Sequence, residues 1–193
     1  MREEKAALRT ALREVVIDDD LRTTASRSIT DAILDHPAFI DAPSITAFVG
    51  VRNEPDTLAI LHTALDLHKH VYLPRVADRT RLAWHRIHDL HSFVTTPYGL
   101  LEPSPASPST LHIPEGVALA LVPGLAFASD GARLGHGRGY YDRALATTTA
   151  HRLGVTLSRF LDPPEGPIPT TATDVFMHAI VTERDLTSCP PVR

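Results

Sequence analysis

Hydrophobic residues recur every three to four positions at the start of the chain, which is the pattern of amphipathic helices. Residues 3–16 and 20–35 each place several apolar side chains on one helical face. These positions are Ala7, Leu8, Leu12, Val15 and Val16 in the first segment, and Leu21, Ala25, Ile29, Ala32 and Ile33 in the second. The acidic residues 18–20 separate the two segments and can cap the second one. We therefore expect two helices joined by a short turn.

Short uninterrupted apolar runs farther along the chain predict buried strands. They cover residues 45–50, 71–73, 117–122, 153–157 and 179–182. We expect Pro74 to end the second of these strands, and helices to begin at Pro55 and at about Tyr140. Residues 81–87 alternate, which predicts an edge or antiparallel strand with Trp84 in the core. Strands that alternate with helices indicate an α/β fold with a mostly parallel sheet.

The remaining segments are typical of connections. Residues 97–116 are rich in proline and serine and predict an ordered loop or flap, and residues 162–173 predict a further loop. We expect the C-terminus to be frayed. A length of 193 residues fits a single domain that spans residues 1–193.

Composition narrows the class of protein. Apolar residues make up 43% and charged residues 22%, which fits a globular domain with a true core. The net charge of −4 and the lack of a basic run disfavour nucleic-acid binding. The single cysteine, Cys189, can form neither an internal disulfide nor a CxxC zinc site, so we expect a reducing, cytoplasmic location. The sequence lacks a long apolar segment and the apolar stretch of a signal peptide, so we expect no membrane contact.

The segment with most chemical information is residues 122–143, VPGLAFASDGARLGHGRGYYDR, which follows a predicted strand and leads into a predicted helix. Ligands of open α/β sheets bind at the carboxyl ends of strands. Glycines at 131, 135, 137 and 139 let the backbone wrap closely around a ligand and form an anion-binding concavity. Arg133 and Arg138 suit phosphate oxygens, and Asp142 could hold a phosphate-bound Mg²⁺. The segment is neither GxxxxGK[ST] nor GxGxxG, and glycines before a helix also fit a tight connection.

The whole pattern VPGLAF…G-x-RLG-x-G-x-GYYDR resembles that of the 5-formyltetrahydrofolate cyclo-ligases, also called methenyltetrahydrofolate synthetases. Further matches occur in the same order along nearly the whole chain. They are Lys5-x-x-x-Arg9, VRNEPDT at residues 51–57, Leu73-Pro74-Arg75, YGLLEP at residues 98–103, and a closing segment at residues 168–183. The family fold implied is a three-layer α/β/α domain that resembles the sugar-phosphate isomerases.

The resemblance implies roles for individual residues. Lys5 and Arg9, which share a helical face, would reach the phosphates of ATP. A continuous loop would bind ATP, and it consists of Arg133, Leu134, Gly135, His136, Gly137, Arg138, Gly139, Tyr140 and Tyr141. The part of this loop from His136 to Tyr140 would also face the reduced folate. Val51, Glu54 and Asp56 would bind folate, with Tyr98 as a further aromatic candidate. The implied catalytic side chains are those of Arg133, Arg138 and Tyr140. The implied Mg²⁺ ligands are Asp142 and Asp174.

The implied activity is the ATP- and Mg²⁺-dependent conversion of 5-formyltetrahydrofolate to 5,10-methenyltetrahydrofolate. ATP would phosphorylate the formyl oxygen, and N10 would close the ring. Protein positioning and charge suffice for such chemistry, so no nucleophilic side chain is expected. The expected partners are these small molecules, and the expected state is a monomer.

Two positions depart from the family pattern, and three other functions stay open. His178 stands where the family often has a second acid, four residues after Asp174, and Arg138 stands where glycine or lysine is common. The spacing of His85, His88 and His91, and of His68 and His70, leaves a zinc site as an alternative. A different α/β phosphotransferase or sugar-phosphate isomerase is the second alternative. The third is a non-catalytic protein that binds folate or nucleotide.

Overall fold

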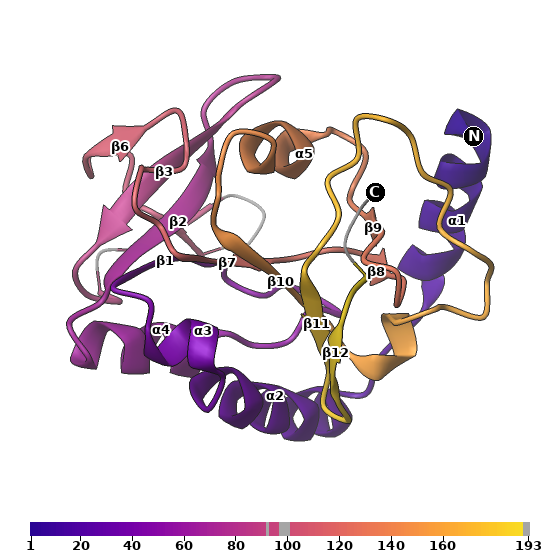
Figure 1. Cartoon of the computed structure of the whole chain (residues 1–193), viewed down its shortest axis with the longest axis horizontal. Helices are drawn as coiled ribbons and strands as arrows, with labels where there is room; N and C mark the ends of the chain where they lie inside the picture. The colour runs from indigo at the N-terminus through magenta and orange to yellow at the C-terminus, as the bar shows by residue number, and fades with distance from the viewer. Residues whose placement is uncertain (92, 97–100, 191–193) are drawn as a thin grey trace.

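The computed structural model describes residues 1–91, 93–96 and 101–190 and has an eight-stranded mixed sheet at its centre (Figure 1). The strand order is β12-β11-β10-β7-β1-β2-β3-β6. The strands are β1 (Ser44–Thr46), β2 (His70–Val76), β3 (Leu82–Ile87), β6 (Ser109–Thr110), β7 (Leu119–Val122), β10 (His151–Val155), β11 (Ala179–Val181) and β12 (Leu186–Ser188). The five strands from β11 to β2 are parallel, and the outer pairings are antiparallel. The predicted α/β class with a mostly parallel sheet is confirmed.

Helices lie on both faces of this sheet. Helices α2 (Asp19–Leu34), α3 (Pro37–Ile40) and α4 (Leu58–Asp66) lie on one face, and α5 (Tyr140–Leu145) lies on the other (Figure 1). Helix α1 (Arg2–Glu14) lies at one end of the molecule, near the small hairpin of β8 (Ala126–Phe127) and β9 (Arg133–Leu134). A second hairpin joins β4 (Phe93–Thr95) to β5 (Leu101–Pro103), and a 3₁₀ turn covers Ser158–Phe160.

Strand β7 shows how a continuous apolar run serves both faces of the sheet. Leu119 and Leu121 belong to the core cluster that includes α2 and α4, whereas Ala120 and Val122 belong to the cluster that includes α5. Side chains alternate across a strand, so a strand that is covered on both faces needs apolar residues at every position. The apolar run that predicts β7 therefore contributes side chains to both clusters. Trp84 lies in the second cluster, as predicted.

The two predicted N-terminal helices are present, and their ends have identifiable causes. The Asp18 carboxylate caps α2 by accepting hydrogen bonds from the backbone N–H groups of Asp20 and Leu21. Helix α1 ends at Glu14, and Val15 is extended, with its carbonyl accepting a 2.7 Å hydrogen bond from the Asn53 side chain. Val16 is consequently 88% exposed, so its predicted place on the buried helix face is wrong.

The structure corrects several predicted boundaries; β1, for example, covers Ser44–Thr46 and not residues 45–50. Three further differences concern β2, the C-terminus and the 97–116 loop. Strand β2 continues through Pro74 to Val76. The backbone polar groups of Tyr72 face β1, and the pairing with β1 ends at this residue. Pro74, two residues later, has its backbone nitrogen on the same side, where no strand follows, so its missing N–H costs no hydrogen bond to β1. Residues 186–188, expected to fray, pair with β11 as the edge strand β12. Part of the expected 97–116 loop forms β5 and β6, while residues 97–100 lie outside the described residues.

The structure shows the surroundings of His85, one of the histidines whose spacing left a zinc site as an alternative. His85 is buried in β3, and its Nδ1 lies 3.0 Å from the carbonyl oxygen of Ser107. In the described part of the chain, no three His, Cys, Asp or Glu side chains come together in a way that could hold a metal ion. The zinc alternative therefore gains no support from the geometry. No helix in the described ranges is long and apolar enough to span a bilayer.

His178, which replaces the acid common in the resembling family, belongs to a stack of three histidines at the start of β10. The rings of His36 and His151 are 5.9 Å apart, and those of His151 and His178 are 5.1 Å apart. The Nδ1 atom of His178 accepts a 2.9 Å hydrogen bond from the backbone of Arg152. Burial, His36 and Arg152 lower the pKa of His151, and burial, Arg152 and His151 lower the pKa of His178.

We expect the free energy of unfolding to fall as the pH drops from about 7 to about 5. A histidine whose pKa is lower in the folded state binds protons more readily in the unfolded state. Its protonation below the unfolded pKa of about 6.5 therefore favours unfolding. Urea unfolding across this pH range measures the effect. The His178→Gln variant should show a shallower decline, and an unchanged slope in that variant would contradict the assignment.

Candidate active site

A cavity of about 1050 Å³ lies at the carboxyl end of β7, where ligands of α/β sheets bind. Its walls come from α1, from the glycine-rich loop 135–139, from α5 and from residues 172–175. Six of its lining side chains are basic and two are acidic: Lys5, Arg9, Arg13, Arg133, Arg138 and Arg143, and Asp142 and Asp174. The cavity is therefore suited to a polyanionic ligand.

The glycine-rich loop is built so that its backbone lies against arginine side chains. A Cβ at Gly135 would be 2.8 Å from Nη1 of Arg133, and a Cβ at Gly137 would be 3.3 Å from Cζ of Arg9. Gly137 also has φ of +101°, a conformation that side chains with a Cβ rarely adopt. Gly139, with φ of +66°, precedes α5. The glycines of the sequence motif are therefore needed for both space and conformation.

Helix α1 directs basic side chains at this loop. The Nε of Arg9 donates a 2.8 Å hydrogen bond to the carbonyl oxygen of Gly135, and Nη2 of Arg13 donates a 3.2 Å bond to that of His136. Burial is the main cause that lowers the pKa of Arg9, and the positive charge of the nearby Arg13 lowers it further. The structure brings the predicted Lys5 and Arg9 to the cavity. It adds Arg13, which continues their spacing of four residues and could have been found by that signal.

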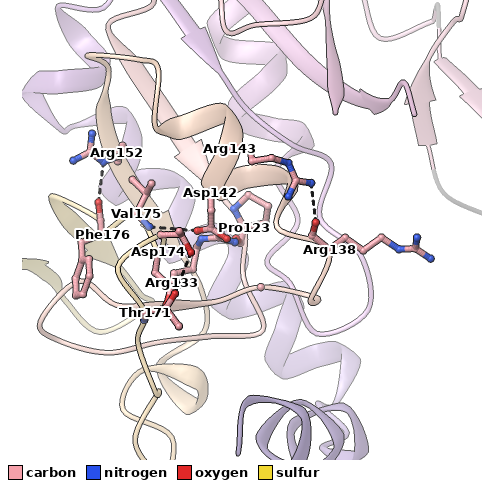
Figure 2. Close-up of polar contacts among 12 residues, drawn as sticks. Pro123, Arg133, Arg138, Asp142, Arg143, Arg152, Thr171, Asp174, Val175 and Phe176 are labelled. Carbon is pink, nitrogen blue, oxygen red and sulfur yellow. Dashed lines mark hydrogen bonds and ion pairs between the residues drawn. The ribbon is translucent and has the colours of Figure 1, made fainter. Parts of the chain in front are cut away.

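The two predicted metal ligands line the same cavity, close together (Figure 2). Oδ1 of Asp142 accepts a 2.8 Å bond from Nη2 of Arg133 and a 3.4 Å bond from the backbone of Val175, the residue after Asp174. Oδ2 of Asp174 accepts from Lys5 Nζ at 2.5 Å and from the backbone of Thr171 at 2.7 Å. Burial alone would raise the pKa of Asp174, but these hydrogen bonds and the positive charge of Lys5 outweigh it, so the pKa is lowered.

Arg133 and the two tyrosines form the inner wall. The Arg133 side chain is only 4% exposed, and its guanidinium lies 5.5 Å from the ring centre of Tyr141. Tyr141 packs edge-on against Trp84, and burial raises the pKa of its hydroxyl. The Tyr140 hydroxyl donates a 3.1 Å bond to the carbonyl of Asp78. Both tyrosines line the cavity, as predicted, while they also pack against neighbouring elements.

Leu134 does not share this position, although the resemblance placed it in the ATP site. Its side chain is fully buried in the core, and its carbonyl accepts a hydrogen bond from the backbone of Leu125 in the β8–β9 hairpin. Alternation along β9 explains this, because Arg133 faces the cavity and its neighbour must face the other side. Leu134 therefore supports the loop from behind.

Arg138 and Arg143 form the outer rim. Nη2 of Arg143 donates a 2.8 Å bond to the carbonyl of Arg138, and its Nε donates a 2.7 Å bond to that of Thr80. The side chain of Arg138 extends away from this contact, as Figure 2 shows. Arg143 thus holds the loop through its backbone, and the Arg138 guanidinium makes no hydrogen bond or ion pair among the described residues. The sequence motif contains Arg143, but nothing in the pattern sets it apart from other helix arginines.

A smaller cavity of about 70 Å³ adjoins the first, and its lining includes three of the predicted folate residues, Val51, Glu54 and His136. The other predicted folate residues of the loop, from Gly137 to Tyr140, line the larger cavity. Oε2 of Glu54 accepts a 3.1 Å bond from the backbone of Val51, and its Oε1 lies 3.7 Å from Nε2 of His136. Asp56 lines neither cavity; it is exposed and its carboxylate accepts a hydrogen bond from Leu58 at the start of α4. Tyr98 lies outside the described residues.

Comparisons with known proteins agree with the sequence resemblance. The family model described as the 5-formyltetrahydrofolate cyclo-ligase family matches residues 1–183. The mitochondrial 5-formyltetrahydrofolate cyclo-ligase of Arabidopsis thaliana is 30% identical over 97% of this chain and 77% of its own length. The 5-formyltetrahydrofolate cyclo-ligase of Mycolicibacterium smegmatis is 34% identical over 75% of this chain and 76% of its own length.

Solved structures give the same result at the level of the fold. The 5,10-methenyltetrahydrofolate synthetase of Aquifex aeolicus superimposes with a TM-score of 0.81 at 25% identity, covering 98% of this chain and 94% of the other. The fold also matches the synthetase of Mycoplasma pneumoniae, with a TM-score of 0.72, 18% identity, and coverage of 93% and 98%. The chain therefore belongs to the 5-formyltetrahydrofolate cyclo-ligase family and is an enzyme of that ligase class.

Proposed function

We propose that the protein uses ATP and Mg²⁺ to convert 5-formyltetrahydrofolate to 5,10-methenyltetrahydrofolate. The observation that carries the proposal is the pairing of two adjoining cavities. The larger one is rich in arginine and has a glycine backbone wall, which suits a triphosphate. The smaller one contains a carboxylate, Glu54, and apolar side chains such as Leu125 and Phe160, which suit one edge of a pterin with ring N–H groups. The rest of the folate would extend toward the loop from His136 to Tyr140 in the larger cavity.

The residues present fit a magnesium ion at Asp142 and Asp174. Oδ2 of Asp142 accepts no hydrogen bond from the described part of the chain, and the bonds from Lys5 Nζ and from the backbone of Thr171 to Asp174 both go to its Oδ2. Mg²⁺ in phosphoryl-transfer sites takes one or two carboxylates together with phosphate oxygens and water. When bound, it would neutralise charge on the β- and γ-phosphates.

In the proposed reaction the formyl oxygen attacks the γ-phosphorus, the bond from that phosphorus to the β,γ-bridging oxygen breaks, and ADP leaves. N10 then attacks the formyl carbon and loses its proton, and phosphate departs from that carbon. Lys5, Arg9 and Arg138 would hold the triphosphate, and Arg133 would contribute charge from the inner wall. Glu54 and Val51 would orient the pterin. The chain provides position and charge, so no covalent enzyme intermediate is needed.

The test is to mix the protein with 5-formyltetrahydrofolate, ATP and Mg²⁺ and to follow methenyl absorbance together with ADP formation. We expect both products to form in equal amounts, and neither to form without folate or without ATP. Turnover of sugar phosphates in the absence of ATP would contradict the proposal. So would folate and nucleotide binding without any ADP formation, which is the behaviour of a non-catalytic binding protein.

A further inference from the structure

The two cavities share only two lining residues, Arg13 and His136. A group passed from a nucleotide in the larger cavity to a folate in the smaller one must cross between them at this boundary. The backbone of His136 and the guanidinium of Arg13 meet there, joined by the 3.2 Å hydrogen bond from Nη2. In the smaller cavity, the His136 ring lies near the Glu54 carboxylate. Contacts of His136 with Arg13 and with Glu54 therefore hold the boundary in place.

Arg13 has unused hydrogen-bond donors and lines both cavities. Arg9 and Arg138 also have unused guanidinium N–H groups among the described residues, but neither lines the smaller cavity. Lys5 and Arg133 are paired with carboxylates, and Arg143 spans two carbonyls. Within the described residues, Nε and Nη1 of Arg13 meet no acceptor, and the side chain pairs with no carboxylate. A guanidinium with unused donors presents a planar fork that matches phosphoryl oxygens.

We propose that Arg13 is a catalytic residue that contacts the phosphoryl group during its transfer from ATP to the formyl oxygen. This inference rests on the proposed function. As the bond from the γ-phosphorus to the bridging oxygen breaks and the bond to the formyl oxygen forms, negative charge is spread over the equatorial oxygens of the phosphoryl group. Arg13 stabilises that charge at the boundary between the cavities, where the charge develops, and contributes little to the binding of either substrate in the ground state.

The experiment compares wild type with the Arg13→Met and Arg13→Lys variants. We expect Arg13→Met to lower kcat by about 100-fold. Its Kd values for 5-formyltetrahydrofolate and for a non-hydrolysable ATP analogue should stay within about threefold of wild type. Lysine keeps the charge without the fork and should recover only part of the loss. Added guanidinium ion should raise the kcat of an Arg13→Gly variant and leave its Kd for the ATP analogue unchanged.

The matched control is Arg2→Met, which removes an arginine from the same helix at a position that lines neither cavity. It should turn over like wild type. Unchanged kcat in Arg13→Met, or a large loss of ATP-analogue affinity with kcat preserved, would overturn the catalytic role of Arg13 and leave the proposed function intact. A wild-type protein that forms no methenyl product would overturn both, so the two failures are distinguishable.

Discussion

Replacing Asp142 with alanine is expected to abolish turnover and also to destabilise the fold. The change removes one of the two carboxylates proposed to hold Mg²⁺. It also removes the only carboxylate paired with Arg133 among the described residues, and the Arg133 side chain is just 4% exposed. Leaving a buried charge without its partner costs about 3–5 kcal/mol. Steady-state turnover at ordinary Mg²⁺ and urea unfolding measure the two effects.

The Asp142→Asn variant separates these effects. An amide oxygen can still accept the hydrogen bond from Nη2 of Arg133 but carries no counter-charge, so only part of the stability should return. Turnover should stay low, because a neutral amide is a poor ligand for Mg²⁺. Wild-type turnover in either variant would contradict the metal assignment. Wild-type stability in Asp142→Ala would contradict the structural role of the ion pair.

The glycine-rich loop shows what sequence can predict well. Its chemistry is local: the strand, the turn and the helix that build it are consecutive, and the glycines are required by the backbone itself. The apolar run of β7 and the recurrence of apolar residues every three to four positions in α1 likewise depend on neighbouring residues. The local pattern therefore located the cavity wall, whereas Lys5 and Arg9, which also line the cavity, were implied only by the resemblance to the family.

The remaining features depend on contacts between distant segments, which local patterns do not record. The pairing of Asp174 with Lys5 joins residues at the two ends of the chain. Glu54 and Asp56 are both acidic and two residues apart, yet only Glu54 lines a cavity, because Asp56 serves α4. The boundary formed by Arg13 and His136 exists only once α1 packs near the loop. Edge strand β12 was missed for the same reason, since its partner β11 supplies the pairing.

Replacing Gly137 with valine is expected to weaken ATP binding by about 100-fold, or about 3 kcal/mol, while the protein stays folded. Valine disfavours the φ of +101° found at this position, and its Cβ would be 3.3 Å from Cζ of Arg9. The loop would have to move away from α1, which would displace both Arg9 and the backbone that faces the phosphates. Titration with a non-hydrolysable ATP analogue measures the loss.

Gly116→Val is the matched control, because Gly116 also has a positive φ, of +80°, but a Cβ there would meet no atom within 4 Å. It lies outside both cavities and precedes β7. Both variants therefore incur backbone strain, and only Gly137→Val alters the cavity wall. Equal ATP affinity in the two variants would show that the glycine loop does not hold the triphosphate. A loss confined to Gly137→Val would locate nucleotide binding at the place where the loop backbone meets Arg9.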